Sequence, residues 1–331
     1  KVKQVMNITD VDDKTIRGAK NSNKSLKEFT SLYEKEFLKD AGALNIKSAW
    51  KYPRATEHIK EMVMMIEILL KKKNAYKTEN GIYFDISKFK KYGKLSRVKK
   101  RELKSGTRII QDEYKKNDAQ DFALWKFKKD GEPSWPAKFG EGRPGWHIEC
   151  SAMSVKYLGM PIDIHSGGVD LIFPHHENEI AQSEAAFGKK FVRFFSEGEH
   201  LMIDGEKMSK SLGNLFTLKD IIAKGFEPLD FRYLTLTAHY RSPLSFTWGS
   251  LTASRNARLK LNEKALNSPY EDKKSFDKFK KEFEAAINDD LNIPKALGLV
   301  WKSKGKKSIL FADEILGLDL GKTRKIEMPK E

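Results

Sequence analysis

Three side chains that could bind a metal ion lie in one stretch of the chain: Cys150, His175 and Glu179. Cys150 is the only cysteine, so no disulfide within the chain can form. Pro174 followed by residues 175–187 predicts a helix start, and residues four apart on a helix share a face, as His175 and Glu179 would. A thiolate, an imidazole and a carboxylate are common zinc ligands, and catalytic zinc sites often have three protein ligands. The spacing is therefore that of an open zinc site.

The same residues also allow a simpler interpretation. A lone cysteine such as Cys150 is often a small buried hydrophobe. A histidine and a glutamate at helical spacing, as at His175 and Glu179, often form a solvated or structural pair. Spacing alone leaves both interpretations open.

A second string, Lys207-Met208-Ser209-Lys210-Ser211, follows the turn at residues 204–206. Two ammonium groups and neighbouring hydroxyls on a loop could neutralise a polyphosphate as charge develops on its leaving oxygens. The alternative is a solvated turn without a ligand.

The elements around these residues have the pattern of α/β units. We expect a helix near His147 to Tyr157, a strand at residues 162–165, a turn at Gly167 and Gly168, and then the helix that begins near His175.

Further helices and strands are predicted before and after this region. Upstream, residues 5–9 resemble the end of a buried strand, and the helices Ser25 to Asp40 and Ala55 to Lys72 show apolar positions at helical spacing. Strands are expected at residues 81–86 and 122–125. From about Thr217 the chain is predicted to be helical to its end.

Composition indicates a globular chain with a basic surface. Among 331 residues, 39% are hydrophobic and 33% charged, which fits two or more domains. The net charge of +16 attracts polyanions, nucleic acid first, although an evenly lysine-rich chain would show the same excess. No apolar run reaches the roughly 20 residues of a membrane span. A single cysteine and an N-terminus without a secretory pattern favour a reducing cytoplasm.

Several segments resemble one enzyme family. Lys207 to Ser211 is similar to the second signature of class I aminoacyl-tRNA synthetases. Other segments resemble the cysteinyl-tRNA synthetase family, in order and over nearly the whole chain: Asn7 to Lys14, Arg54 to Ile59, Gly142 to Met153 and His165 to Gln182.

The resemblance implies a fold and a division into domains. The expected class is α/β, a Rossmann-like parallel-sheet catalytic domain with a connective insertion, followed by an α-helical tRNA-binding domain. The catalytic domain would span residues 1–215 with the insertion at about 55–140. A linking stem-contact region at 216–248 and the helical tRNA- or anticodon-binding domain at 249–331 would follow, with residues 289–297 as its most recognisable piece.

The resemblance also implies one zinc ion per chain, bound by Cys150, His175 and Glu179. The ion would bind the thiolate of substrate L-cysteine, which separates cysteine from serine because a hydroxyl is a much poorer zinc ligand. The residues implied around the amino acid are Thr9, Trp146 and His165.

For ATP, the resemblance implies Gly167 and Gly168 at the adenosine and Asp170 at the ribose hydroxyls. The loop residues Lys207, Met208, Ser209 and Lys210 would also contact ATP. The two lysines are the expected catalytic residues, since they would stabilise the pyrophosphate leaving group, with Mg²⁺ accompanying ATP. The second implied step transfers cysteine to the terminal adenosine of tRNA(Cys), whose backbone the basic surface would contact.

The sequence departs from the family in three places. A His-Ile-Gly-His-like first signature and a fourth zinc ligand, a cysteine, are expected before Lys1, so the sequence as it stands should not activate cysteine efficiently. At residues 195–198 Phe-Ser-Glu-Gly stands where the family usually has tryptophan and then histidine and asparagine.

Two other functions fit parts of the same pattern. One is a related ligase that joins cysteine to an amino-sugar, which would not need residues 249–331. The other is a catalytically silent tRNA-binding paralogue, which need not retain the zinc residues.

Overall fold

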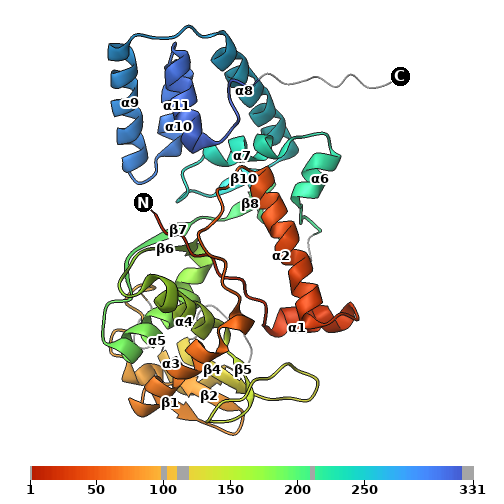
Figure 1. Cartoon of the computed structure of the whole chain (residues 1–331), viewed down its shortest axis with the longest axis vertical. Coiled ribbons are helices and arrows are strands. Elements are labelled where there is room, and N and C mark those ends of the chain that lie inside the picture. Colours follow the sequence, from red (N-terminus) through yellow and green to blue (C-terminus); the bar gives the residue numbers. More distant parts are fainter. Residues whose placement is uncertain (1, 98–102, 110–118, 209–212, 323–331) are drawn as a thin grey trace. The chain divides into compact units, whose positions relative to one another are not determined.

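The computed structural model describes most of the chain: residues 2–97, 103–109, 119–208 and 213–322. For residues 103–109 and 119–120 only the backbone is described. The chain forms two compact units (Figure 1). Unit 1 comprises Lys1–Phe37 and Ala49–Glu197, and unit 2 comprises Leu38–Ser48 and Gly198–Glu331.

A five-stranded sheet lies in unit 1, next to helix α3 (Ile59–Lys71). Its strands are β1 (Ala75–Lys77), β2 (Gly81–Phe84), β3 (Leu103–Ile109), β4 (Ala119–Phe127) and β5 (Gly142–Pro144). The order is β1-β2-β4-β3 with β5 paired to β4, and among these pairs β3 and β4 run parallel while the others run antiparallel. The helix buries Met62, Ile66 and Leu69 in the same core as strand residues Ile82 and Leu124. The helix and the two strands predicted here are confirmed, the helix after a short 3-10 turn at Ala55–Glu57.

The remaining part of unit 1 carries the predicted metal residues. Helices α4 (Trp146–Leu158) and α5 (Glu177–Phe187) pack against each other, while β6 (Ile162–Gly168) and β7 (Val192–Gly198) form a two-stranded sheet. A 3-10 turn at Val169–Leu171 and a five-residue turn at Ile172–His176 lead from β6 into α5. The predicted helix near residues 147–157 and the strand at 162–165 are confirmed.

Two local predictions in unit 1 are wrong. Gly167 and Gly168 end strand β6 instead of forming a turn, and Gly168 is extended, with φ −87° and ψ 157°. Residues 5–9 form no strand, because only isolated parallel bridges from Val5 to Lys51 and from Ile8 to Arg54 join them to the rest of unit 1. Glycine permits a turn but does not require one.

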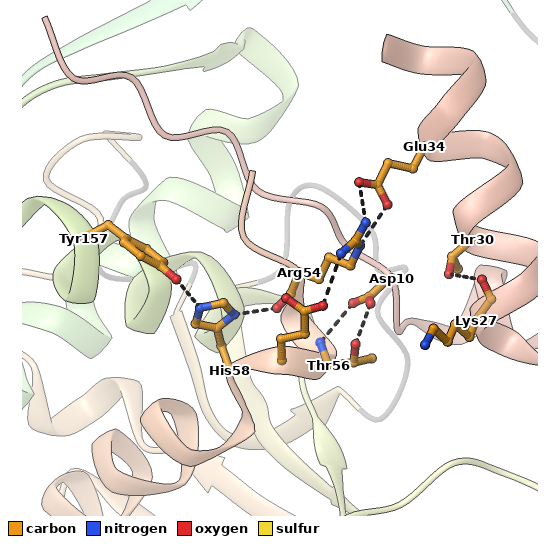
Figure 2. A network of polar contacts seen from close by, with 9 residues as sticks. Asp10, Lys27, Thr30, Glu34, Arg54, Thr56, His58 and Tyr157 are labelled. Carbon is orange, nitrogen blue, oxygen red and sulfur yellow. Dashed lines mark hydrogen bonds and ion pairs between the residues drawn. The ribbon is translucent and has the colours of Figure 1, made fainter. Parts of the chain in front are cut away.

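Polar contacts join two of the sequence motifs in unit 1 (Figure 2). Asp10 accepts hydrogen bonds from the backbone N–H and the hydroxyl of Thr56, at 2.9 and 2.5 Å. Arg54 makes a bidentate pair with Glu34, with both N–O distances 2.8 Å. His58 lies between the Arg54 carbonyl and the Tyr157 hydroxyl, and so ties the same motif to α4.

Figure 2 also draws Lys27 and Thr30 on helix α2, Leu26–Ala43, whose first part belongs to unit 1. The Thr30 hydroxyl donates to the carbonyl of Leu26 at 2.9 Å, one turn earlier in the helix. Helix α1 (Asp13–Asn21) precedes α2, and Asp12 caps its start by accepting from the Thr15 N–H.

Unit 2 combines a small sheet with helices. Strands β8 (Leu201–Ile203), β9 (Glu206–Lys207) and β10 (Leu244–Phe246) pair in the order β10-β8-β9. The helices are α6 (Leu218–Ala223), α7 (Pro228–Leu236), α8 (Trp248–Asn267), α9 (Lys273–Asn288), α10 (Ile293–Lys302) and α11 (Lys306–Leu316). The prediction of unbroken helix after Thr217 is wrong at β10, because residues 244–246 pair in parallel with β8.

Residues 198–215 belong to the same compact unit as the helices that follow them. The functional boundaries expected from the sequence, at 215 and 248, stay predictions, as does a parallel sheet at the centre of the catalytic domain. None of the described helices combines the length and the apolar character that crossing a membrane requires.

Candidate metal centre and substrate site

The structure brings Cys150, His175 and Glu179 together. One possible ligand atom of each lies within 4.8 Å of the others, and all three residues are buried. Cys150 comes from α4, His175 from the turn before α5, and Glu179 from the first turn of α5 (Figure 1). The proximity of the three residues depends on the packing of α4 against α5, and their role as metal ligands stays a prediction.

The charge states of two of these residues suit a cation. Burial disfavours the charged form of Glu179, but His165 and His175 outweigh burial and lower its pKa to about 2, so the carboxylate is ionised. Burial lowers the pKa of His175 to about 4, which leaves a neutral imidazole with a free lone pair.

The thiol of Cys150 behaves differently. Burial, together with the charges of Glu179 and Glu149, raises its pKa well above the ordinary value. The thiol is therefore protonated in these surroundings unless a cation is bound beside it, since a coordinated metal ion deprotonates a thiol.

The hydrogen bonds of the cluster also fit a metal ion. His165 Nε2 lies 2.9 Å from Glu179 Oε2, and because the carboxylate can only accept, His165 donates. The other oxygen, Glu179 Oε1, is buried and has no hydrogen-bond partner among the described residues. A buried carboxylate oxygen without a donor is costly, and a cation at this position would satisfy it.

Sequence reasoning missed His147, which lies beside the ligand candidate His175. The two Nδ1 atoms are 2.8 Å apart, so one donates to the other and the Nε2 atom of His175 is left facing Glu179 Oε2 at 3.7 Å. The signal was present in the sequence, because His147 precedes Cys150 by one helical turn.

A second group, His165, His176 and Glu179, also has its possible ligand atoms within 4.8 Å of one another. His176 Nδ1 lies 2.7 Å from Oε1 of Glu197 on β7. Neither His176 nor Glu197 was predicted as a site residue, and the pairing of Glu197 follows from the position of β7, for which the sequence carries no local signal.

The residues expected around the amino acid are placed unequally. Trp146 lies against His175, with ring centroids 4.5 Å apart, and His165 belongs to the cluster itself. Thr9 is half-buried and accepts from the Asn7 side chain at 3.2 Å, and no described contact joins it to the cluster.

The residues expected at ATP are divided between the two units. Gly167 and Gly168 end β6, and Asp170 is exposed in the following turn. In unit 2, Lys207 is exposed on β9 and Met208 lines a cavity of about 130 Å³. Ser209 and Lys210 lie outside the described residues.

The sequence comparison decides the family. The profile described as the catalytic domain of class I (C) tRNA synthetases matches residues 1–256. The chain belongs to the class I cysteinyl-tRNA synthetase family. The chain is 47% identical to the cysteine–tRNA ligase of Brachyspira hyodysenteriae, and the match covers 91% of this chain and 66% of that protein. It is also 47% identical to the cysteine–tRNA ligase of Opitutus terrae, over 100% of the chain and 76% of that protein.

The fold of this chain is similar to that of class I synthetases. The methionyl-tRNA synthetase of Mycobacterium tuberculosis, solved with methionyl-adenylate, superposes with a TM-score of 0.66 over 95% of this chain and 76% of that one. The two sequences are 14% identical, so this likeness concerns the fold alone.

Proposed function

We propose that the chain carries the catalytic residues for ATP-dependent activation of L-cysteine and its transfer to the 3′-terminal adenosine of tRNA(Cys). The observation that carries the proposal is the buried cluster of Cys150, His175 and Glu179 in a chain of the cysteinyl-tRNA synthetase family. The relatives compared above are cysteine–tRNA ligases, which does not favour an amino-sugar ligase or a silent paralogue. The chain spans just under two thirds of the Brachyspira protein, so the whole protein's activity is part of the proposal.

Zn²⁺ is the proposed cofactor, one ion per chain, held by Cys150, His175 and Glu179. When bound, zinc supplies a position that prefers a thiolate over the hydroxyl of serine. Glu179 contributes a fixed negative charge, and the hydrogen bond from His165 holds its Oε2 atom.

Trp146, His165 and Thr9 are proposed to contact the amino acid. The indole of Trp146 covers one side of His175 and so excludes water from that side of the cluster. The side chain of His165 is partly exposed, whereas that of Glu179 is fully buried. Of the two, a substrate can therefore reach only His165.

Lys207 and Lys210 are proposed to neutralise the pyrophosphate as the cysteine carboxylate attacks the α-phosphate of ATP. Mg²⁺ would accompany ATP, with Gly167, Gly168 and Asp170 at the adenosine. Met208 and Ser209 complete the proposed contacts to ATP. The chemistry needs positioning and charge stabilisation more than acid–base catalysis.

The finer features of the organisation also belong to the proposal. They are a Rossmann-like parallel sheet in the catalytic domain, a tRNA-binding role for the helices at 249–331 and a cytoplasmic location. The chain has 62 lysine and arginine residues against 46 aspartate and glutamate residues, and this basic excess supports contact with the tRNA backbone.

The test is cysteine-dependent exchange of pyrophosphate into ATP, followed by aminoacylation of tRNA(Cys), on the longest natural form of the protein loaded with Zn²⁺. We expect exchange with cysteine and far less with serine. Absence of exchange by the zinc-loaded protein would contradict the enzyme proposal. Transfer to an amino-sugar in place of tRNA would favour the alternative ligase.

A further inference from the structure

Glu197 is a buried carboxylate to which the proposed reaction gives no role. It lies near the end of β7 and is 8% exposed. Its Oε1 atom lies 2.7 Å from His176 Nδ1, and because a carboxylate can only accept, His176 donates from Nδ1. The contact therefore fixes both the tautomer of His176 at this nitrogen and the orientation of its ring.

The imidazole of His176 is enclosed on its other sides. The ring centroids of His165 and Phe195 lie 4.7 and 5.4 Å from its own. A Cβ atom added to Gly167 would lie 2.7 Å from His176 Cε1 and 2.9 Å from Nε2, closer than real Cβ contacts. Gly167 does not have a positive φ, so the close approach of His176, and not the backbone conformation, requires glycine here.

The enclosed ring is turned toward the metal cluster. His176 Nε2 faces Glu179 Oε2 at 4.0 Å, and His165 Nε2 donates to the same oxygen at 2.9 Å. The Oε2 atom of Glu179 thus lies between these two imidazoles, and Oε1 is buried without a hydrogen-bond partner among the described residues.

Gly167, His176 and Glu197 are called the positioning triplet below. We infer that the positioning triplet holds Glu179 in the orientation in which it binds the metal ion. The inference rests on the metal site of the proposed function. Glu197 acts through His176, and Gly167 acts by leaving the space that the His176 ring fills. Groups that orient metal ligands in this way typically change metal affinity by about 10- to 100-fold when they are removed.

The experiment measures the Zn²⁺ affinity of the full chain by competition with a chromophoric chelator. Glu197→Ala is expected to weaken Zn²⁺ binding by about 10- to 100-fold. Glu197→Gln retains an acceptor oxygen for His176 and should stay close to the wild-type affinity. In the Co²⁺-loaded proteins the thiolate absorption band of Cys150 should remain, because the triplet does not touch the thiol.

A second variant keeps the inference testable if Glu197→Ala does not fold. Gly167→Ala should displace the His176 ring and weaken Zn²⁺ binding in the same range. Gly298→Ala is its control, since an added Cβ meets nothing within 4 Å there. If Gly167→Ala raises the KM for ATP and leaves Zn²⁺ affinity unchanged, the glycine serves the nucleotide and the inference is overturned.

The outcomes separate this inference from the proposed function. If the wild-type chain binds no Zn²⁺, the metal site of the proposed function fails. If the wild type binds Zn²⁺ and neither Glu197→Ala nor Gly167→Ala weakens it, only the positioning triplet is refuted. Two equivalents of Zn²⁺ per wild-type chain would make His176 a ligand and would also overturn the inference.

Discussion

At the scale of single residues, Glu179 is the side chain on which the metal centre depends. Glu179 is completely buried and belongs to both groups of possible ligands. Burial alone would raise its pKa, but His165 and His175 act in the opposite direction and lower the pKa to about 2. A buried anion is tolerated only where opposite charge or donors surround it. The hydrogen bond from His165 supplies part of this compensation, and a divalent ion would supply the rest.

The first prediction concerns this carboxylate. Glu179→Ala should remove one proposed ligand. Groups that only orient a ligand typically change metal affinity by about 10- to 100-fold, and the loss of Zn²⁺ affinity in Glu179→Ala should be larger than that. The measurement is metal content after dialysis against a weak chelator. Glu184→Ala, which removes a carboxylate of the same helix that pairs with Lys91, is the matched control. Equal zinc content in Glu179→Ala and wild type would show that the ligand assignment is wrong.

A second residue-scale prediction concerns the lysines of the second signature. Lys207→Ala and Lys210→Ala should each reduce the rate of pyrophosphate exchange by about 10²- to 10³-fold, because each removes charge that stabilises the leaving group. Zn²⁺ affinity should not change, since the metal residues lie in unit 1 and Lys207 belongs to unit 2. Lys224→Ala, at another exposed lysine of unit 2, is the control. An unchanged exchange rate in both variants would remove the lysines from the mechanism.

At the scale of elements, helices α7 and α8 are joined by a buried ion pair. Arg258 is 1% exposed and its Nη2 lies 2.7 Å from Asp230 Oδ1 and 3.0 Å from Glu227 Oε2. Asp230 is itself completely buried. Removing one partner of a buried pair leaves the other uncompensated, which is why such changes are costly.

Arg258→Met is therefore predicted to lower the free energy of unfolding by about 3–5 kcal/mol. Denaturant unfolding at neutral pH measures the change. Lys260→Ala, at an exposed position of the same helix, should stay within about 0.5 kcal/mol of wild type. The double change Arg258→Met with Asp230→Leu should recover part of the loss. A loss below about 1 kcal/mol in the single variant would contradict the role given to the pair.

Asp290, between α9 and α10, accepts hydrogen bonds from three side chains of the segment before β10. Tyr240 donates to its Oδ1 at 2.7 Å, Arg241 to its Oδ2 at 2.6 Å, and His239 to its backbone carbonyl at 2.8 Å. The hydrogen bond from Arg241, followed by that from Tyr240, lowers the pKa of Asp290 from the usual 3.8 to about 2. The carboxylate thus ties the segment before β10 to the helices after α8.

This depressed pKa predicts a pH dependence. A carboxylate whose pKa is lower in the folded than in the unfolded protein stabilises the folded state. This contribution to stability is complete above the unfolded pKa and is lost as pH falls from about 3.8 to about 2. Wild type should therefore lose more stability over this window than Asp290→Asn, as measured by urea midpoints at several pH values. The group is exposed, so the effect is small. Parallel pH profiles of the two proteins would contradict the prediction.

At the scale of the whole molecule, the net charge of +16 favours an electrostatic contribution to the tRNA binding proposed above. Each tRNA phosphate that a lysine or arginine neutralises releases counterions, so the affinity falls as salt rises. The charge is spread along the chain, and the sequence does not assign single contacts.

The prediction at this scale is a linear fall of the logarithm of tRNA affinity with the logarithm of salt concentration. A slope between about −0.7 and −0.9 per neutralised phosphate gives the number of contacts. Filter binding between 50 and 200 mM salt is the measurement, with tRNA(Cys) compared against a tRNA of another specificity. An affinity that does not depend on salt would exclude backbone contacts as the main source of binding.

Much of the candidate site could be predicted from the sequence because its chemistry is local. Cys150 is the only cysteine, and the four-residue spacing of His175 and Glu179 already places both on one helical turn. The helices and strands with clear apolar periodicity, such as α3 and β2, were likewise predicted correctly. These features depend on residue type and short spacing, which the sequence contains directly.

Tertiary structure alone decided which distant groups surround those residues. The pairing of His176 with Glu197 requires that β7 lie beside the turn before α5, and the strand at residues 244–246 exists because β8 offers it a partner. Gly167 was predicted as part of a turn, yet it ends a strand and gives room to an imidazole. A strand partner or a close ring contact is formed by residues far apart in sequence, so no local pattern of residue types encodes it.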